Sequence, residues 1–140
     1  MEARNDGRTH IVRLDRGEPV IASLQRYIGD KGIQGGSVIG IGSIEATELG
    51  FFVPGERRYD RRAFPEPLEL LSFAGTISRL DGAPFIHAHV TLGGHDYGVV
   101  GGHLFEAKVA VTGEFAIHEA DAASSRVLDD DTGLKLMRFG

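Results

Sequence analysis

The sequence predicts an α+β fold in which a mostly antiparallel β-sheet carries one main amphipathic helix. Most apolar segments are short, many alternate apolar with polar residues, and glycine, proline or Asp-Gly turns separate them, as in strands joined by hairpins. Only residues 20–28 place their apolar side chains at helical spacing. The chain has 140 residues and no internal repeat or linker, so we expect one domain over residues 1–140.

The first quarter of the chain is predicted to form a strand and then the helix. Residues 9–14 alternate well enough for a strand, although Ile11 interrupts the pattern. Gly17-Glu18-Pro19 should begin the helix, because proline is tolerated in a first turn and an acidic side chain suits the positive end of the helix dipole. One apolar stripe must then pack on the sheet, and two glycines end the helix. The stripe is Val20, Ile21, Leu24, Tyr27 and Ile28, and the glycines are Gly29 and Gly32.

The middle of the chain reads as a series of strands. Residues 34–44 include an apolar, glycine-broken run typical of a buried strand, and residues 47–53 are expected to form a hairpin with it. Residues 68–77 alternate after a proline-rich break, and Asp81-Gly82 should turn the chain into a strand over residues 85–92.

The last third is predicted to contain a returning hairpin arm at residues 97–101 and a strong strand at residues 108–118. That strand should place five residues on one face, namely Val109, Val111, Gly113, Phe115 and Ile117. Residues 119–133 are small and acidic and are interpreted as a surface excursion. Its Asp129-Asp130-Asp131 run lacks the spacing of a calcium-binding loop. Residues 134–139 would add a closing edge strand.

The strand over residues 85–92 carries the residues of greatest chemical interest. Because strand residues i and i+2 project from the same face, His87 and His89 point the same way, about 6 to 7 Å apart. Each ligating nitrogen need lie only about 2 Å from a zinc ion, so the two rings can share one ion. The alternative is that both are half-buried strand residues with ordinary hydrogen bonds.

His103 is the candidate third ligand, and the hairpin register decides whether it can reach the other two. A three-residue turn at residues 94–96 pairs His103 with His87 on the shared face. A two- or four-residue turn pairs it with Ile86 and turns it away, unless Gly101-Gly102 hosts a β-bulge. In the alternative interpretation, His95 is a loop tip and His103 a strand end, as we expect of His10 and His118.

Several short motifs follow one another along the chain in a specific order and spacing. They occupy residues 7–10, 13–18, 40–44, 69–77, 87–90, 100–104 and 111–115. Together they resemble the plant and prokaryote conserved (PPC) domain over nearly the whole chain. The resemblance implies a small α+β domain that commonly forms trimers. The family's plant members are nuclear proteins in which a separate AT-hook binds DNA.

The sequence departs from the plant pattern, since it has no Arg-Gly-Arg-Pro hook and carries histidines where plant members mostly have none. It is more similar to the stand-alone bacterial and archaeal members. Their fold is similar to that of acetolactate decarboxylase, a zinc enzyme whose metal is held by a His-x-His pair and a following Gly-Gly-His. His87, His89 and His103 match that arrangement, so the resemblance implies a three-histidine zinc site.

Composition limits the remaining function classes. Without cysteine, thiolate zinc sites, disulfides and cysteine nucleophiles are excluded. No apolar run approaches the roughly 20 residues of a membrane span and the first residues show no signal core, so we expect a soluble, cytoplasmic protein. The formal net charge of −5 argues against broad contact with nucleic-acid phosphates. One cluster at residues 57–62 places four arginines around Tyr59. Either the cluster binds an anionic partner, or its charge protects an exposed edge strand from pairing with other chains.

Two functions from different classes follow. The first is a zinc-dependent enzyme or binding protein for a small molecule, in which the open fourth position of the metal takes water or a carbonyl group. The second is a non-enzymatic oligomeric interaction domain associated with DNA. A zinc-dependent reaction would also need a proton-transfer group and a cationic side chain to anchor an anionic substrate. The carboxylate candidates are Glu45, Glu69, Glu106 and Glu114, and the anion-anchor candidates are Arg13 and Arg79.

Overall fold

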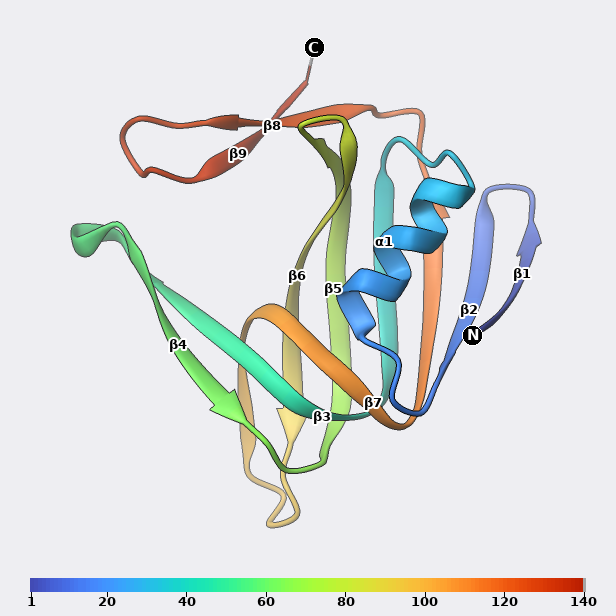
Figure 1. The fold of residues 1–140 in the computed structure, drawn as a ribbon, viewed down its shortest axis with the longest axis vertical. Coiled ribbons are helices and arrows are strands. Elements are labelled where there is room, and N and C mark those ends of the chain that lie inside the picture. The colour runs from blue at the N-terminus through green and yellow to red at the C-terminus, as the bar shows by residue number, and fades with distance from the viewer. Residues whose placement is uncertain (140) are drawn as a thin grey trace.

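The structure is a computed structural model that describes residues 1–139, in which nine strands form one connected sheet with a single α-helix beside it (Figure 1). The strand pairs are antiparallel except for a single parallel pair between β5 and β8. The predicted α+β class is therefore confirmed. The elements are β1 (Glu2–Asp6), β2 (Thr9–Asp15), α1 (Val20–Asp30), β3 (Gly36–Val53), the 3-10 turn η1 (Pro54–Glu56), β4 (Arg58–Phe64), β5 (Leu68–Leu80), β6 (Ala83–Gly93), β7 (Val99–Glu119), β8 (Ser124–Leu128) and β9 (Lys135–Phe139).

The hydrophobic core lies between α1 and the sheet. The helix covers one face of the central strands (Figure 1) and packs against β6 and β7. Its predicted stripe is buried apart from the partly buried Ile21. Behind it the rings of Phe73 and Phe115 meet edge to face, with their centroids 5.3 Å apart. The helix continues through Gly29 to Asp30, and Gly32 follows in the left-handed conformation, with φ of 70°.

Two long strands replace several shorter predicted ones. The expected hairpin between residues 34–44 and 47–53 is wrong, because β3 runs through both segments and bends instead of reversing. Ala46 takes a left-handed φ of 48°, and the register with β7 shifts at this point, as in a β-bulge. Likewise β7 joins the two segments predicted at residues 97–101 and 108–118.

Four strands form a closed circuit in which β3 and β6 each pair with the same two neighbours. Strand β3 pairs with β5 and β7, while β6 pairs with both β5 and β7. The second half of β3 continues diagonally away and carries β4 along its edge (Figure 1). This circuit brings the middle of β6 close to the first half of β7, where the candidate ligands lie.

The remaining elements confirm some predictions and correct others. The Asp81-Gly82 turn and the C-terminal edge strand are confirmed. Residues 119–133 are more than a surface excursion, because β8 lies within them and pairs with β9. Val111 was predicted to share one face with four residues that are all buried, but it is 69% exposed, since another register shift between β3 and β7 lies beside it. Ile11, the doubtful position of the first strand, is exposed.

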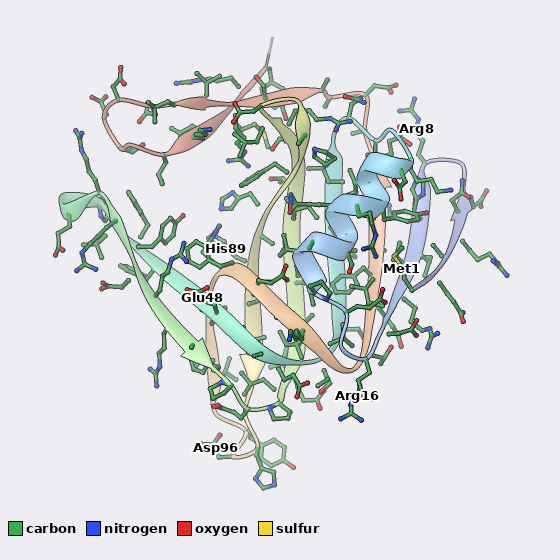
Figure 2. All side chains as sticks on the ribbon, viewed as in Figure 1. Met1, Arg8, Arg16, Glu48, His89 and Asp96 are labelled. Atoms are coloured by element: carbon green, nitrogen blue, oxygen red, sulfur yellow. The ribbon has the colours of Figure 1, made fainter. Side chains whose placement is uncertain are left out.

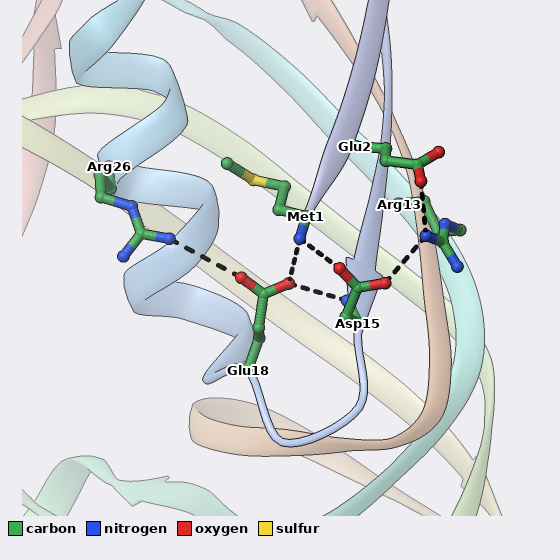
Figure 3. A network of polar contacts seen from close by, with 6 residues as sticks. All are labelled: Met1, Glu2, Arg13, Asp15, Glu18 and Arg26. Atoms are coloured by element: carbon green, nitrogen blue, oxygen red, sulfur yellow. Dashed lines mark hydrogen bonds and ion pairs between the residues drawn. The ribbon is translucent and has the colours of Figure 1, made fainter.

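Polar contacts fasten the N-terminal segment to the start of the helix (Figure 3). The terminal ammonium contacts Asp15 and lies 3.0 Å from a carboxylate oxygen of Glu18. Arg13 is held between Asp15 at 2.9 Å and Glu2 at 3.1 Å. Arg13 is therefore paired with carboxylates at this surface. No helix within residues 1–139 is long and apolar enough to span a membrane.

Candidate metal centre

The three predicted ligands come from two neighbouring strands. His87 and His89 lie on β6, and His103 lies on β7 directly opposite His89. The predicted three-residue turn is wrong, because Gly93 pairs with Val99 and residues 94–98 form the loop. The register therefore differs by two residues from the expected one. A two-residue shift leaves every side chain on its original face, so His103 still faces the other two rings.

The loop itself is closed by backbone and side-chain hydrogen bonds. The amide of Gly94 donates to the carbonyl of Gly98 at 2.9 Å, and the amide of Gly98 donates to Asp96 Oδ1 at 2.9 Å. Tyr97 adopts a left-handed φ of 62°. Figure 2 places Asp96 at this loop and His89 well away from it, nearer the middle of the molecule.

Glycines bring three strands close together around His103. Gly101 and Gly102 form regular pairs with β6, so they do not form the bulge that a two- or four-residue turn would have required. A Cβ atom on Gly101 would lie 2.7 Å from the carbonyl oxygen of Val90, and one on Gly102 would lie 3.0 Å from that of Gly50. Gly50 pairs with His103 from the β3 side. These glycines are needed for close approach.

The three imidazoles converge on one point. Their ligating nitrogens all lie within 4.8 Å of one another, and the ring centroids are 5.1 to 5.6 Å apart. A tetrahedral zinc ion would hold its ligand nitrogens about 3.3 Å apart, so small ring movements would complete the site. The convergence that a shared metal requires is thus present, while metal binding by His87, His89 and His103 stays a prediction.

The electrostatics of the centre favour the neutral form of His87 and His103. Nδ1 of His103 is buried and has no hydrogen-bond partner among residues 1–139. Burial, followed by the neighbouring His87 and His89, lowers the pKa of His103 to about 4. Burial also lowers the pKa of His87, and Arg126 and His89 add to this effect. Neutral imidazole is the form that binds metal, so these residues fit a cation ligand set.

Aromatic side chains surround His103. Its ring centroid lies 5.1 Å from that of Tyr59 on β4 and 4.8 Å from that of Phe105. Tyr59 and Phe105 also pack edge to face, with centroids 5.1 Å apart. The guanidinium of Arg61 covers the Phe105 ring at 3.8 Å. These contacts restrict the orientation of the His103 ring.

A cavity of about 420 Å³ opens beside the centre. His87 and His103 form part of its wall, and the rest comes from α1, Tyr59, the end of β5, the start of β6, the two residues that follow His103 on β7, and the β8–β9 hairpin. Arg126 of that hairpin lines the cavity, whereas no Asp or Glu within residues 1–139 does. A hollow of about 580 Å³ between β3, β4 and the start of β7 contains none of the three histidines.

A model of the Plants and Prokaryotes Conserved (PCC) domain matches residues 1–121. The chain belongs to this family. Residues 122–139, which include β8 and β9, lie beyond the matched part of this PPC-domain chain. A comparison with curated proteins finds no match.

Solved structures from three organisms are similar to this PPC-domain protein over most of its length. A Bacteroides thetaiotaomicron protein, described provisionally as DNA binding, is 32% identical with a TM-score of 0.94, covering 99% of this chain and 96% of its own. A Pyrococcus horikoshii PPC protein is 32% identical with a TM-score of 0.87, and the match covers 94% of this chain and 92% of the P. horikoshii chain. A protein from Archaeoglobus fulgidus, described as metal-containing, is 33% identical with a TM-score of 0.86, and the match covers 98% of this chain and 95% of the A. fulgidus chain.

The side chains expected to assist the metal lie elsewhere in the PPC domain. Glu106 accepts hydrogen bonds from the amides of Ile21 at 2.8 Å and Ala22 at 3.1 Å, so it caps the N-terminus of α1. The other expected carboxylates do not line the cavity. Arg79 donates to Gln34 and to the carbonyl of Ile33. The candidates not found at the cavity are Glu45, Glu69, Glu106, Glu114, Arg13 and Arg79.

The lining residues of the PPC-domain cavity that were not predicted as site residues include two rings that contact His103 and one arginine. Phe105 lies two residues after His103 on one strand, a spacing that could have placed both on one face. Tyr59 was interpreted only as part of an arginine cluster, and Arg126 as part of a surface segment. His10 lies at one end of its strand, as expected, being the second residue of β2, but it is buried, and its Nδ1 lies 3.0 Å from the Tyr27 hydroxyl. His118 is an exposed residue near the end of β7, as predicted.

Proposed function

We propose that this protein holds a zinc ion at His87, His89 and His103 and binds a small molecule beside it. The observation that carries the proposal is the convergence of three imidazole nitrogens within 4.8 Å of one another, with the rings of His87 and His103 at the wall of a cavity. The unpartnered Nδ1 of His103 gives independent support. The similar A. fulgidus protein is described as metal-containing. Zinc suits an all-imidazole tetrahedral set, although nickel, copper and iron compete for such ligands.

The cavity residues suit binding more clearly than turnover. A bound zinc ion would supply an open coordination position and Lewis acidity. The chain's own contribution is to hold neutral imidazoles, to exclude water with apolar walls and to offer the positive charge of Arg126. No carboxylate within residues 1–139 lines the cavity to act as a general base. Ligand binding is therefore the core of the proposal.

Metal content measured by inductively coupled plasma mass spectrometry tests the centre. We expect about one zinc per chain in the wild type and a loss of most of it in H87A, H89A and H103A. His118→Ala is the matched control, because His118 is an exposed strand histidine outside the cavity. Circular dichroism checks that each variant is folded. Full zinc occupancy in folded H87A, H89A and H103A would contradict the proposal.

We also propose that the protein associates with copies of itself, as a trimer. Four apolar side chains on neighbouring strands are at least half exposed, namely Ile39 and Ile41 of β3, Leu71 of β5 and Val111 of β7. Such a patch on a sheet face is typical of an interaction surface. Light scattering after size exclusion should give the trimer mass for the wild type and a smaller mass for Ile41→Glu. Val127→Glu, at an exposed site on β8, is the control. A monomeric wild type would refute the proposal.

The structure gives no specific support for DNA binding. In the arginine cluster of β4, Arg58 pairs with Glu56 and Asp60, and Arg61 pairs with Glu48 at 3.1 Å. These pairs reduce the positive charge available to phosphates, and the net charge is −5. We therefore expect no shift of a DNA probe at physiological salt. A salt-sensitive shift would favour the interaction-domain function instead.

A further inference from the structure

Arg126 places a positive charge at the cavity beside the histidine centre. The residue lies on β8 and is half-buried. Its Nε donates to the hydroxyl of the buried Ser78 at 3.0 Å, and its Nη1 donates to the carbonyl of Lys135 at 3.3 Å. The guanidinium carbon lies 5.1 Å from the centroid of the Phe85 ring. These contacts fix the side chain, while Nη2 has no hydrogen-bond partner within residues 1–139.

The charge on Arg126 has no counter-ion within residues 1–139. Lys135, the other cationic side chain of the cavity, pairs with Asp81 at 3.0 Å, but Arg126 forms no ion pair. The remaining polar side chains of the cavity are Gln25, Tyr59 and the rings of His87 and His103, none of which is an anion at neutral pH. Burial lowers the pKa of Arg126, and its charge in turn lowers the pKa of both histidines. A half-buried cation among neutral or cationic neighbours is unfavourable without an anion.

The rest of the cavity is largely apolar. Its walls include Leu80, Phe85, Ile86, Leu104 and Leu136. The volume of about 420 Å³ falls within the range of small-molecule sites. One unpaired positive charge in such walls matches a ligand with one negative charge and an apolar body. Inorganic phosphate has no apolar body and would leave these apolar walls unfilled.

We propose that Arg126 binds the carboxylate of a small monoanionic ligand whose apolar body fills the cavity beside the histidines. This inference rests on the proposed function, because it names the class of molecule held next to the metal. Arg126 takes the anion-anchor role that the sequence suggested for Arg13 or Arg79. It lies beyond residues 1–121, the part that the family model matches, so the C-terminal hairpin supplies this specificity.

Isobutyrate and isobutyramide provide a matched pair of probes, because they have nearly the same shape and differ in charge. Binding is followed by ¹⁵N-resolved NMR titration of both metal-free and zinc-loaded protein. We expect isobutyrate to bind the wild type at least tenfold more tightly than isobutyramide. Arg126→Gln should weaken isobutyrate binding at least tenfold and leave zinc content unchanged. Lys135→Gln, which changes a cavity cation already paired with Asp81, should alter the affinity less than twofold.

Several outcomes would overturn the proposal. They are equal affinity for the acid and the amide, wild-type affinity for isobutyrate in R126Q, no isobutyrate binding at all, or tighter binding of inorganic phosphate. The acid–amide comparison uses wild-type protein and therefore decides the matter even if R126Q fails to fold. Zinc content is measured separately, so a chain that binds isobutyrate through Arg126 but no zinc refutes the proposed metal function alone.

Discussion

Replacement of Gly101 by alanine tests whether strand spacing controls the metal centre. Gly101 lies on β7 two residues before His103, and a Cβ atom there would lie 2.7 Å from the carbonyl oxygen of Val90. Ordinary van der Waals contact begins at 3.4 Å, so β6 and β7 would have to separate by about 0.7 Å. The obstructing atom belongs to the backbone, so no side-chain rotation can relieve the contact.

The separation should affect both stability and zinc binding. Overpacking of this kind costs about 1–3 kcal/mol of the free energy of unfolding. It would also move His103 away from His89, its direct partner across the two strands. Zinc sites tolerate about 0.2 Å in ligand distance, so the displacement exceeds what the metal accepts without rearrangement. We expect the affinity for zinc to fall about 10- to 100-fold, as when a residue that orients a ligand is changed.

Urea unfolding of the metal-free protein and zinc titration against a competing chelator measure the two effects. Gly55→Ala is the matched control, because a Cβ atom on Gly55 would have no heavy atom within 4 Å and the residue has no left-handed φ. G55A should match the wild type in both assays. Equal stability and equal zinc affinity in G101A and G55A would refute the argument that close approach at Gly101 positions His103.

Three further predictions follow from the surroundings of the centre. The pKa of His103 is lowered to about 4, so the neutral side chain contributes its full stability to the metal-free fold above pH 6.5. This contribution is at most about 2 kcal/mol for a partly exposed group, and it is lost as the pH falls toward 4. Urea unfolding at a series of pH values should show a weaker acid dependence in H103Q, and an unchanged dependence would contradict the assignment. Glu106→Ala should lower the free energy of unfolding in urea by about 1–2 kcal/mol, because it removes the cap of α1, and it should leave zinc content unchanged. Glu69→Ala is the control, since it removes an exposed carboxylate and should leave the free energy of unfolding nearly unchanged. Tyr59→Ala should weaken zinc binding about tenfold in the chelator assay by freeing the His103 ring, whereas Tyr59→Phe should keep the wild-type affinity. Equal zinc affinities of Y59A and the wild type would show that the ring contact is dispensable.

The parity of side chains in strands explains why the ligand set could be predicted without the correct register. His87 and His89 share a face for any strand, and His103 joins them whenever the register differs by an even number of residues. The loop length could not be predicted, because the turn uses Tyr97 in a left-handed conformation. A non-glycine residue gives no sequence signal for that conformation.

The surroundings of the ligands were harder to predict, because they depend on how β3 bends. The sequence favoured a reversal between residues 44 and 47, whereas Ala46 adopts a left-handed φ and the strand continues. That continuation places Gly50 beside His103 and carries β4 close enough for Tyr59 to contact the histidine ring. Arg126 was missed for a similar reason, since its strand lies within a segment whose composition is typical of a loop.

The closed circuit of β3, β5, β6 and β7 explains why the ligands could be predicted while their surroundings could not. His103 is held from one side by pairing with His89 and from the other by pairing with Gly50. Because β3 pairs with β7 on both sides of its bend at Ala46 but reaches His103 only beyond it, the position of the third ligand depends on backbone geometry far from it in sequence. Glycine at position 50 is required there, since a Cβ atom would lie 2.5 Å from the Phe105 ring and 2.8 Å from that of Tyr59. The ligands are thus set by local strand periodicity, and the distance between their rings is set by contacts between distant segments.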